Sequence, residues 1–144
     1  MVEKARELIE RFGDKVKYPI DVACEIDGER VDIDVGEIPN EAIFDIGVKT
    51  IAFYAKEIRD AKYIFANGPA GVFEYPKFAR GTEDLINAMA SSNGFSLIGG
   101  GHIAAATAGL GLEDHMSHLS SGGGACISML AGKKLAAVEA LKNS

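Results

Sequence analysis

Apolar and polar residues in the first part of the chain follow a helical period and then a strand period. Four apolar residues, three or four positions apart, give one face of a predicted helix that ends near Gly13: Ala5, Leu8, Ile9 and Phe12. Residues 20–26 and 31–35 then alternate between apolar and polar side chains, and the pair Asp27-Gly28 separates the two runs. Alternating runs on either side of a D-G pair predict a β-hairpin.

One pattern occurs three times in the second half of the chain: a short apolar strand, a glycine-containing turn and a helix. The predicted strands are YIFA (63–66), FSLI (95–98) and SHLS (117–120), and the turns after them read NGPAG, GGG and SGGG. Before this repeat, residues 36–47 are predicted to form a loop and residues 48–58 a helix. The last ten residues predict a short terminal helix.

Strands that alternate with helices favour an α/β fold with parallel strands. We therefore predict a Rossmann-like three-layer sheet with helices on both faces, together with the β-hairpin. The chain has no tandem repeat, low-complexity tract or linker, so its 144 residues predict a single domain. The first helix has no strand before it, which is unusual for the start of an α/β domain.

Composition narrows the classes of partner. The net charge is −6 and lysine and arginine occur in runs of two at most, which argues against nucleic acid as a partner. No apolar run is long enough to span a membrane, and the charged start MVEKARELIE is unlike a signal peptide, so we expect a cytoplasmic protein. The two cysteines lie far apart and predict neither a disulfide framework nor a zinc site.

The three glycine turns are the candidate ligand-binding segments of the chain. In parallel α/β sheets ligands bind at the carboxyl ends of the strands, and each turn falls at that edge. Helix N-termini present free N–H groups that suit phosphate, and glycines let phosphate oxygens approach the backbone. A single GGG before a helix is also a common tight turn, and neither triple fits the dinucleotide fingerprint or the P-loop.

Longer motifs resemble one family. NGPAGVFE (67–74), followed by FARGTEDL (78–85), closely resembles a signature of phosphoglycerate kinase. IGGGHIAAA (98–106) is similar to the IGGGDT segment of that family. The segment that begins at residue 118 is similar to the HxSTGGG segment and the C-terminal end of the family. YPIDV and IFDIGVKTI upstream correspond to its LPxD and LDIGxxT stretches, and GGGHI is similar to archaeal members.

The resemblance implies a part of a larger enzyme. Members of the family have two domains, and this chain resembles the later part of the nucleotide domain. Residues 1–144 are therefore expected to be a partial C-terminal nucleotide-binding domain that lacks the first strands of its sheet. The family transfers a phosphoryl group between 1,3-bisphosphoglycerate and ADP, and this chain alone is expected to be inactive. The alternative is a non-catalytic nucleotide-binding or interaction module of the same fold.

The same resemblance assigns nucleotide contacts to positions of this sequence. Glu74 corresponds to the residue that hydrogen-bonds the ribose, and Asn67 to a polar contact near the phosphates. Gly99, Gly100 and Gly101 correspond to the loop beside the phosphates. Phe44 is expected to border the adenine, although Ile43 stands where the family usually has glycine.

Two further segments concern the transferred phosphoryl group and the metal. Gly122, Gly123 and Gly124 correspond to the catalytic helix N-terminus that receives the migrating group. His102 and Ile103 replace the aspartate and threonine found next to Mg²⁺ in many relatives. Imidazole is a poor ligand for this cation, so His102 is expected to contact phosphate or water, or else to cap or pack against its helix. Mg²⁺ is expected with ADP or ATP, and no metal ligand is assigned to this chain.

The two remaining histidines are expected to have a structural role and not to bind a metal ion. His115 and His118 are three positions apart but have no third ligand nearby, so structural histidines are expected. The resemblance places 3-phosphoglycerate and 1,3-bisphosphoglycerate on an N-terminal domain that this sequence does not contain. An incomplete sheet exposes a strand edge, and self-association through that edge is expected.

Overall fold

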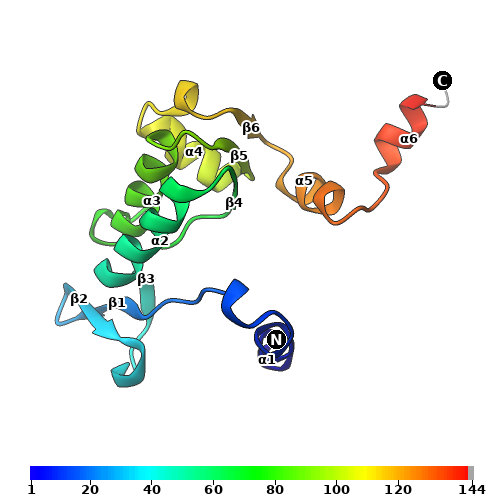
Figure 1. Ribbon diagram of the computed structural model, residues 1–144. Helices are drawn as coiled ribbons and strands as arrows, with labels where there is room; N and C mark the ends of the chain where they lie inside the picture. The colour runs from blue at the N-terminus through cyan, green and yellow to red at the C-terminus, as the bar shows by residue number, and fades with distance from the viewer. Residues whose placement is uncertain (143–144) are drawn as a thin grey trace.

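Two small sheets organise the fold, which the computed structural model describes for residues 1–142 (Figure 1). One sheet is antiparallel with the strand order β2-β1-β3, and the other is parallel with the order β4-β5-β6. This arrangement confirms the predicted α/β fold class with a β-hairpin. Among the described residues, no helix combines the length and the apolar composition needed to cross a membrane.

The antiparallel sheet contains the predicted hairpin and one strand that was not predicted. β1 (Asp21–Ile26) and β2 (Glu29–Asp34) are joined by Asp27 and Gly28, whose φ angles of 52° and 78° are those that a tight hairpin turn requires. β3 (Ile43–Ile46) pairs with the other edge of β1, so the prediction of a loop throughout residues 36–47 is wrong. Four residues are too few to display a period of two.

The parallel sheet follows the predicted repeat. β4 (Tyr63–Asn67), β5 (Phe95–Gly99) and β6 (His118–Ser120) are each followed by one of the glycine turns. Helices α4 (Gly101–Gly109) and α5 (Gly123–Leu130) begin directly after the second and third turns. A longer loop after β4 leads to α3 (Arg80–Ala90). These elements confirm the three strand–turn–helix units.

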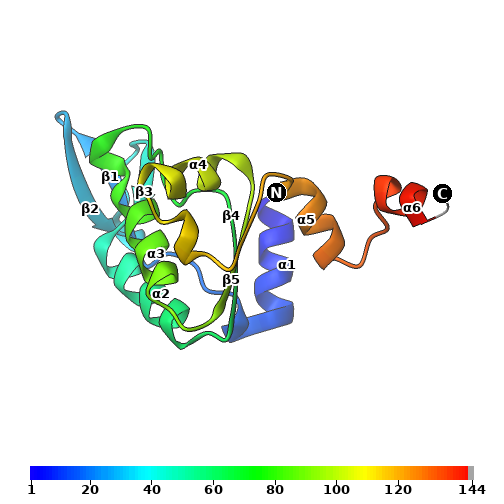
Figure 2. The same cartoon turned by 90° about the horizontal axis from the view of Figure 1, so that it is seen from above.

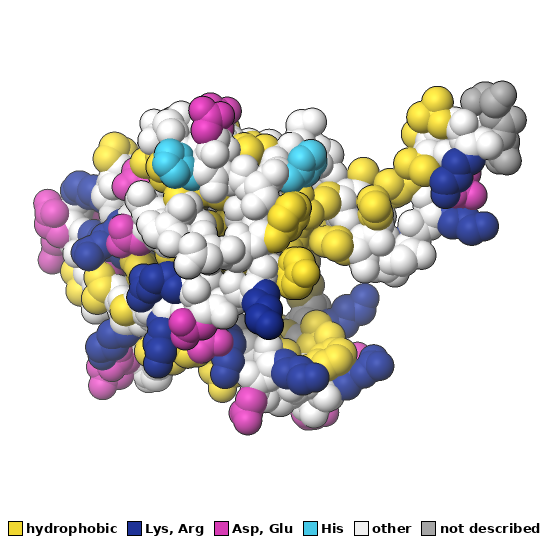
Figure 3. Space-filling view, turned by 45° about the horizontal axis from the view of Figure 1, so that its top comes forward, with side chains coloured by type: hydrophobic (Ala, Val, Ile, Leu, Met, Phe, Trp, Pro, Cys, Tyr) yellow, Lys and Arg dark blue, Asp and Glu magenta, His cyan; other side chains and the backbone are white. Residues whose placement is uncertain are grey.

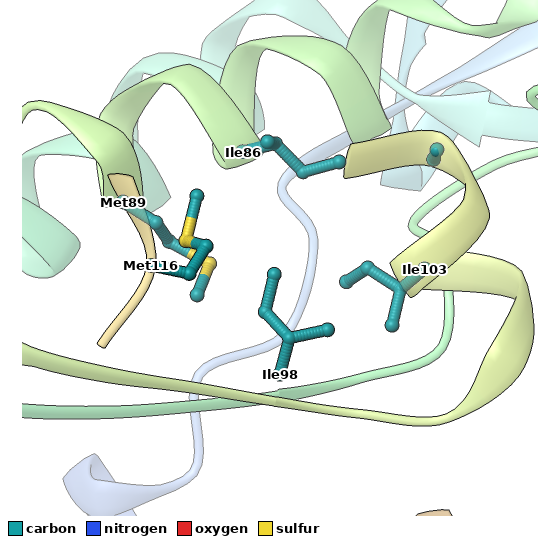
Figure 4. Close-up of a cluster of buried hydrophobic side chains, with 6 residues drawn as sticks. Ile86, Met89, Ile98, Ile103 and Met116 are labelled. Carbon is teal, nitrogen blue, oxygen red and sulfur yellow. The ribbon is translucent and has the colours of Figure 1, made fainter. Parts of the chain in front are cut away.

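The core lies on one face of the parallel sheet, beneath α3 and α4 (Figure 4). Ile86 and Met89 of α3 meet Ile98 of β5 and Ile103 of α4, and Met116 closes the cluster. α2 (Val48–Asp60) packs beside α3 and joins this core to the antiparallel sheet (Figure 1). Burial of these side chains stabilises the packing of α3 and α4 on the parallel sheet.

The opposite face of the parallel sheet is covered only in part. Gly99 points to this face, where a Cβ on it would lie 2.9 Å from the Phe65 ring and 3.6 Å from Cβ of Cys126 in α5. Tyr63 and Phe95 on the same face are 82% and 50% exposed. Figure 2 shows α5 on this side of β4 and β5. Helices were predicted on both faces of the sheet. α3 and α4 cover the core face, and α5 covers the opposite face at the carboxyl end of the strands.

The two terminal helices carry no buried residue. α1 (Val2–Phe12) is the predicted first helix, and α6 (Ala136–Lys142) lies in the predicted terminal one. The apolar stripe of α1 is exposed, with Leu8 and Phe12 at 50% and 43%. Residues 1–142 also contain four short 3-10 helices: η1 (Gly13–Lys15), η2 (Val35–Glu37), η3 (Pro76–Phe78) and η4 (Glu113–His115).

A buried carboxylate joins the antiparallel sheet to α2. Asp21, at the start of β1, accepts hydrogen bonds from the backbone N–H groups of Lys49 and Thr50 at 2.9 and 2.7 Å. The Thr50 hydroxyl donates a third bond at 2.5 Å. Gly47 is needed beside it, because a Cβ at that position would lie 2.2 Å from Cγ of Asp21. Burial alone would raise the pKa of Asp21, but these bonds and the nearby Lys49 charge outweigh it and lower the pKa.

The lowered pKa predicts how acid affects stability. Since the folded-state pKa of Asp21 lies below the unfolded value, its contribution to stability is complete above pH ~4 and is lost as the pH falls through the folded-state pKa. Asp21→Asn should lower the free energy of unfolding by about 1–3 kcal/mol at pH 7, because the amide cannot accept all three bonds as well as the carboxylate does. Urea denaturation from neutral to acid pH measures both effects.

Asp60→Asn, at the exposed end of α2, is the matched control and should change neither the stability nor its dependence on pH. An Asp21→Asn protein that loses stability in acid as steeply as the parent chain would contradict this account of the junction.

Candidate functional site

The three glycine turns come together at the carboxyl edge of the parallel sheet. Asn67, Gly99 and Ser120 end their strands in one register row, with Gly99 paired to both of the others. Oδ1 of Asn67 lies 3.2 Å from where a Cβ on Gly100 would sit and 2.8 Å from the same point on Gly123. That Gly123 position is also 2.8 Å from Cα of Gly100, so any side chain at 123 would force the turns apart. The fold therefore brings together residues from all three predicted turns.

The helices that follow these turns have open N-termini. In α4 the first intrahelical bond runs from Ala104 N–H to the Gly100 carbonyl, which leaves the N–H groups of residues 101–103 at the helix end. In α5 the first bond runs from Cys126 N–H to Gly122, which leaves those of residues 123–125. Neither N-cap residue makes a side-chain capping bond. Two positive helix ends thus lie beside Asn67.

Acidic side chains already cap the other two central helices. At α2, Asp32 accepts from Val48 N–H at 3.1 Å, next to the bonds of Asp21. At α3, Asp45 accepts from Gly81 N–H at 2.8 Å. Because these carboxylates already supply the anion that a helix N-terminus favours at α2 and α3, the ends of α4 and α5 are the better placed to receive one from outside.

Lysine and arginine are absent from the three glycine turns, NGPAG, GGG and SGGG. In the space-filling view, lysine and arginine lie mainly over the lower part of the molecule and near its C-terminal end (Figure 3). An anion at the α4 and α5 ends would therefore be held mainly by backbone N–H groups.

The loop NGPAGVFE is fixed at several points and ends in an accessible carboxylate. The buried Thr82 hydroxyl accepts from the N–H groups of Ala70 and Gly71 at 3.1 and 3.3 Å. Val72 N–H donates to the Phe44 carbonyl of β3 at 2.8 Å. Glu74, two residues later, is exposed. The loop thus presents the predicted ribose contact from an anchored backbone.

Phe44 lines an open groove of about 470 Å³ between β3 and this loop. Its ring stacks on Phe78 with centroids 4.9 Å apart, and the exposed Ile43 lies on the same groove. Pro69, Ala70, Gly71 and Val72 form the other wall. The groove is mostly apolar, and the role of Phe44 beside the adenine stays a prediction.

His102 and Ile103 are neighbours in the chain, but their side chains lie in different environments. His102 is exposed in the first turn of α4, whereas the Ile103 side chain is 5% exposed and belongs to the core. Only the backbone N–H of Ile103 is available at the helix end. Within residues 1–142, no group of three or more His, Cys, Asp or Glu residues is placed to hold a metal ion. His118 begins β6 and is exposed.

Three residues that position the loop were not identified from the sequence. Thr82 and Asp45 are fully enclosed polar side chains, and Val72 acts through its backbone. A Cβ on Gly71 or on Gly81 would lie 2.3 or 2.1 Å from Oδ1 of Asp45. Gly71 within this loop and Gly81 after it were therefore a signal for a buried acid, but no pattern along the chain shows which acid they contact.

Comparisons with known proteins agree on one family. The family model of phosphoglycerate kinase matches residues 1–133. Among curated relatives, phosphoglycerate kinase of Methanothermobacter thermautotrophicus is 55% identical over 99% of this chain and 35% of the relative. That of Methanothermus fervidus is 51% identical over the same shares. The chain thus spans about a third of the length of the curated relatives it matches.

Solved structures give the same result. Phosphoglycerate kinase from Pyrococcus horikoshii OT3 superposes with a TM-score of 0.88 at 38% identity, over 98% of this chain and 36% of that one. The enzyme from Coxiella burnetii gives a TM-score of 0.85 at 36% identity, over 92% and 36%. Sequence, fold and the position of the glycine turns therefore place this chain in the phosphoglycerate kinase family.

Proposed function

We propose that this chain binds ADP or ATP at the carboxyl edge of the parallel sheet, as part of the C-terminal nucleotide domain of a phosphoglycerate kinase. The observation that carries the proposal is the pair of open helix ends beside Asn67, in a fold whose other central helix ends are capped by acids. Such ends bind phosphate through backbone N–H groups and the helix dipole.

In the proposed pose, each part of the nucleotide contacts a different part of the site. The phosphates lie along Gly99, Gly100 and Gly101, with Asn67 as a polar contact and the N–H groups of His102 and Ile103 as donors. The ribose hydroxyls donate to Glu74, and the adenine occupies the groove beside Phe44. A carboxylate suits the ribose because it accepts from both hydroxyls.

The proposed reaction of the whole protein needs no base from this chain. A carboxylate, ionised at pH 7, attacks the terminal phosphorus of ATP, and the bond to ADP breaks to give the acyl phosphate; the reverse reaction makes ATP. Catalysis then depends on positioning and on stabilising charge on the transferred group. The N–H groups of Gly123 and Gly124 at the start of α5 are the donors we assign to the migrating group, with Gly122 as the turn before them.

Magnesium belongs with the nucleotide in this proposal. When bound, the ion neutralises phosphate charge. The residues described at 1–142 offer no cluster of ligands for it, and His102 is a poor one, so phosphate oxygens and water are its proposed ligands.

The substrate acid and the rest of the catalytic groups are assigned to other parts of the whole protein. 3-Phosphoglycerate and 1,3-bisphosphoglycerate bind, in this proposal, to the N-terminal domain, and the enzyme works in the cytoplasm. The chain covers about a third of its relatives, so we expect it to bind nucleotide without catalysing transfer.

Calorimetric titration with magnesium–ADP tests the nucleotide site. We predict saturable binding that Glu74→Ala weakens about 10- to 100-fold, since hydrogen bonds to a charged acceptor contribute about 1.5–3 kcal/mol. Glu57→Ala, on the exposed side of α2, is the matched control and should bind like the parent chain. If the Glu74→Ala protein binds magnesium–ADP as tightly as the parent chain, the nucleotide site does not include Glu74. If the parent chain does not bind magnesium–ADP, the glycine turns have only a structural role in this chain.

We also propose that the chain associates with itself through the free edge of β4. Within residues 1–142 this strand pairs only with β5, and Tyr63 on it is 82% exposed. An unpaired edge with apolar side chains is a template for another strand. Light scattering should therefore detect a dimer or larger species, which Tyr63→Lys converts to monomer. Tyr75→Lys, on the exposed loop after Glu74, should leave association unchanged, and a monomeric parent chain would contradict the proposal.

A further inference from the structure

One buried ion pair links the hairpin to the loop that carries Glu74. Arg30, on β2, donates from Nη1 to Oδ2 of Asp45 at 2.8 Å, with 16% of the arginine side chain and none of the aspartate exposed. Its Nε donates to Asp32 at 3.0 Å. Both acids pair in register with Ala23, which lies between them on β1. The arginine therefore spans the sheet from one edge to the other.

The pair acts on the loop from both sides of Glu74. Before Glu74, the carboxylate of Asp45 lies against Gly71, where it leaves no room for a Cβ, and accepts from Gly81 N–H of α3. After Glu74, Nη1 of Arg30 donates to the Lys77 carbonyl at 3.1 Å. Nη2 donates to the Ile46 carbonyl at 2.9 Å, which fixes the end of β3. The segment between these contacts is the one that presents Glu74.

Arginine is required for this geometry. Its planar guanidinium offers five donors in a fixed fork, and this site uses three of its nitrogens on four acceptors. Lysine would keep the charge, but a single ammonium cannot reach all four. Removing the cation leaves a fully enclosed carboxylate whose charge is uncompensated.

We propose that Arg30 and Asp45 position the Asn67–Glu74 loop for the nucleotide, so that nucleoside affinity depends on a hairpin ion pair that does not touch the ligand. The proposal rests on the function proposed above, with Glu74 as the ribose contact. It assigns the antiparallel sheet a role in ligand recognition, because β2 and β3 supply the two members of the pair.

The first test compares two ligands. Arg30→Met should weaken magnesium–ADP binding about 10- to 100-fold, as expected when a support for a contacting group is lost, and leave inorganic pyrophosphate binding unchanged. Arg30→Lys, which retains the charge, should give a smaller loss and serves if Arg30→Met does not fold. Arg6→Met, at an exposed arginine that pairs with Glu3, is the matched control. Equal weakening of both ligands would indicate a general loss of structure and overturn the proposal.

The second test separates positioning from stability. In a Glu74→Ala background, Arg30→Met should cause no further loss of ADP affinity, because both changes remove the same interaction. Additive losses would overturn the proposal.

A third measurement needs no ligand and distinguishes failure of this proposal from failure of the proposed function. Arg30→Met should speed hydrogen exchange at the Ala70, Gly71 and Val72 amides and leave that of Ile98 in β5 unchanged. This pattern supports positioning even if the parent chain does not bind ADP. Unchanged exchange in the loop contradicts it even if ADP binds.

Discussion

The free N–H groups at a helix N-terminus need acceptors, and this requirement organises the whole molecule. Asp21 and Asp32 supply them for α2, and Asp45 for α3. All three acids lie on the antiparallel sheet, so the capping bonds also hold that sheet to the helices. From the residues that the structure describes, α4 and α5 receive no such acid, and both begin with glycines. The distribution of carboxylates thus separates helix ends that stabilise the fold from helix ends that are open to a ligand.

The open ends become one site because the parallel strands end in register. Asn67, Gly99 and Ser120 share a row, and the absence of side chains at Gly100 and Gly123 lets the turns touch. The loop after Asn67 then runs back to β3, where the Phe44 carbonyl holds it. The site thus offers N–H donors at two helix ends, an exposed carboxylate at Glu74 and a groove beside Phe44. We propose that these three features receive the phosphates, the ribose and the base of a nucleotide.

The sequence predicts the parts of the fold that depend on local pattern. Hydrophobic periodicity and turn residues predict the hairpin around Asp27-Gly28 and the three strand–turn–helix units. They also predict that the glycine turns lie at the carboxyl edge of the parallel sheet. β3 could not be predicted, because its four residues acquire strand geometry only by pairing with β1. Family resemblance assigned nucleotide contacts to Asn67 and Glu74, and these assignments stay predictions, while the side chain of Ile103 lies in the core. Arg30 and Asp45 were missed because their contact joins positions fifteen residues apart through a third strand.

The most direct test of the central claim compares the two kinds of helix end in one experiment. Magnesium–ADP is titrated into the isotopically labelled chain while its backbone amide resonances are followed by NMR. We expect saturable shifts for Gly101, His102, Gly123 and Gly124 at the open ends, and none for Lys49 and Gly81, whose N–H groups are held by carboxylates. Shifts at Lys49 and Gly81 in place of the glycine turns, or no saturable shift at all, would contradict this expectation.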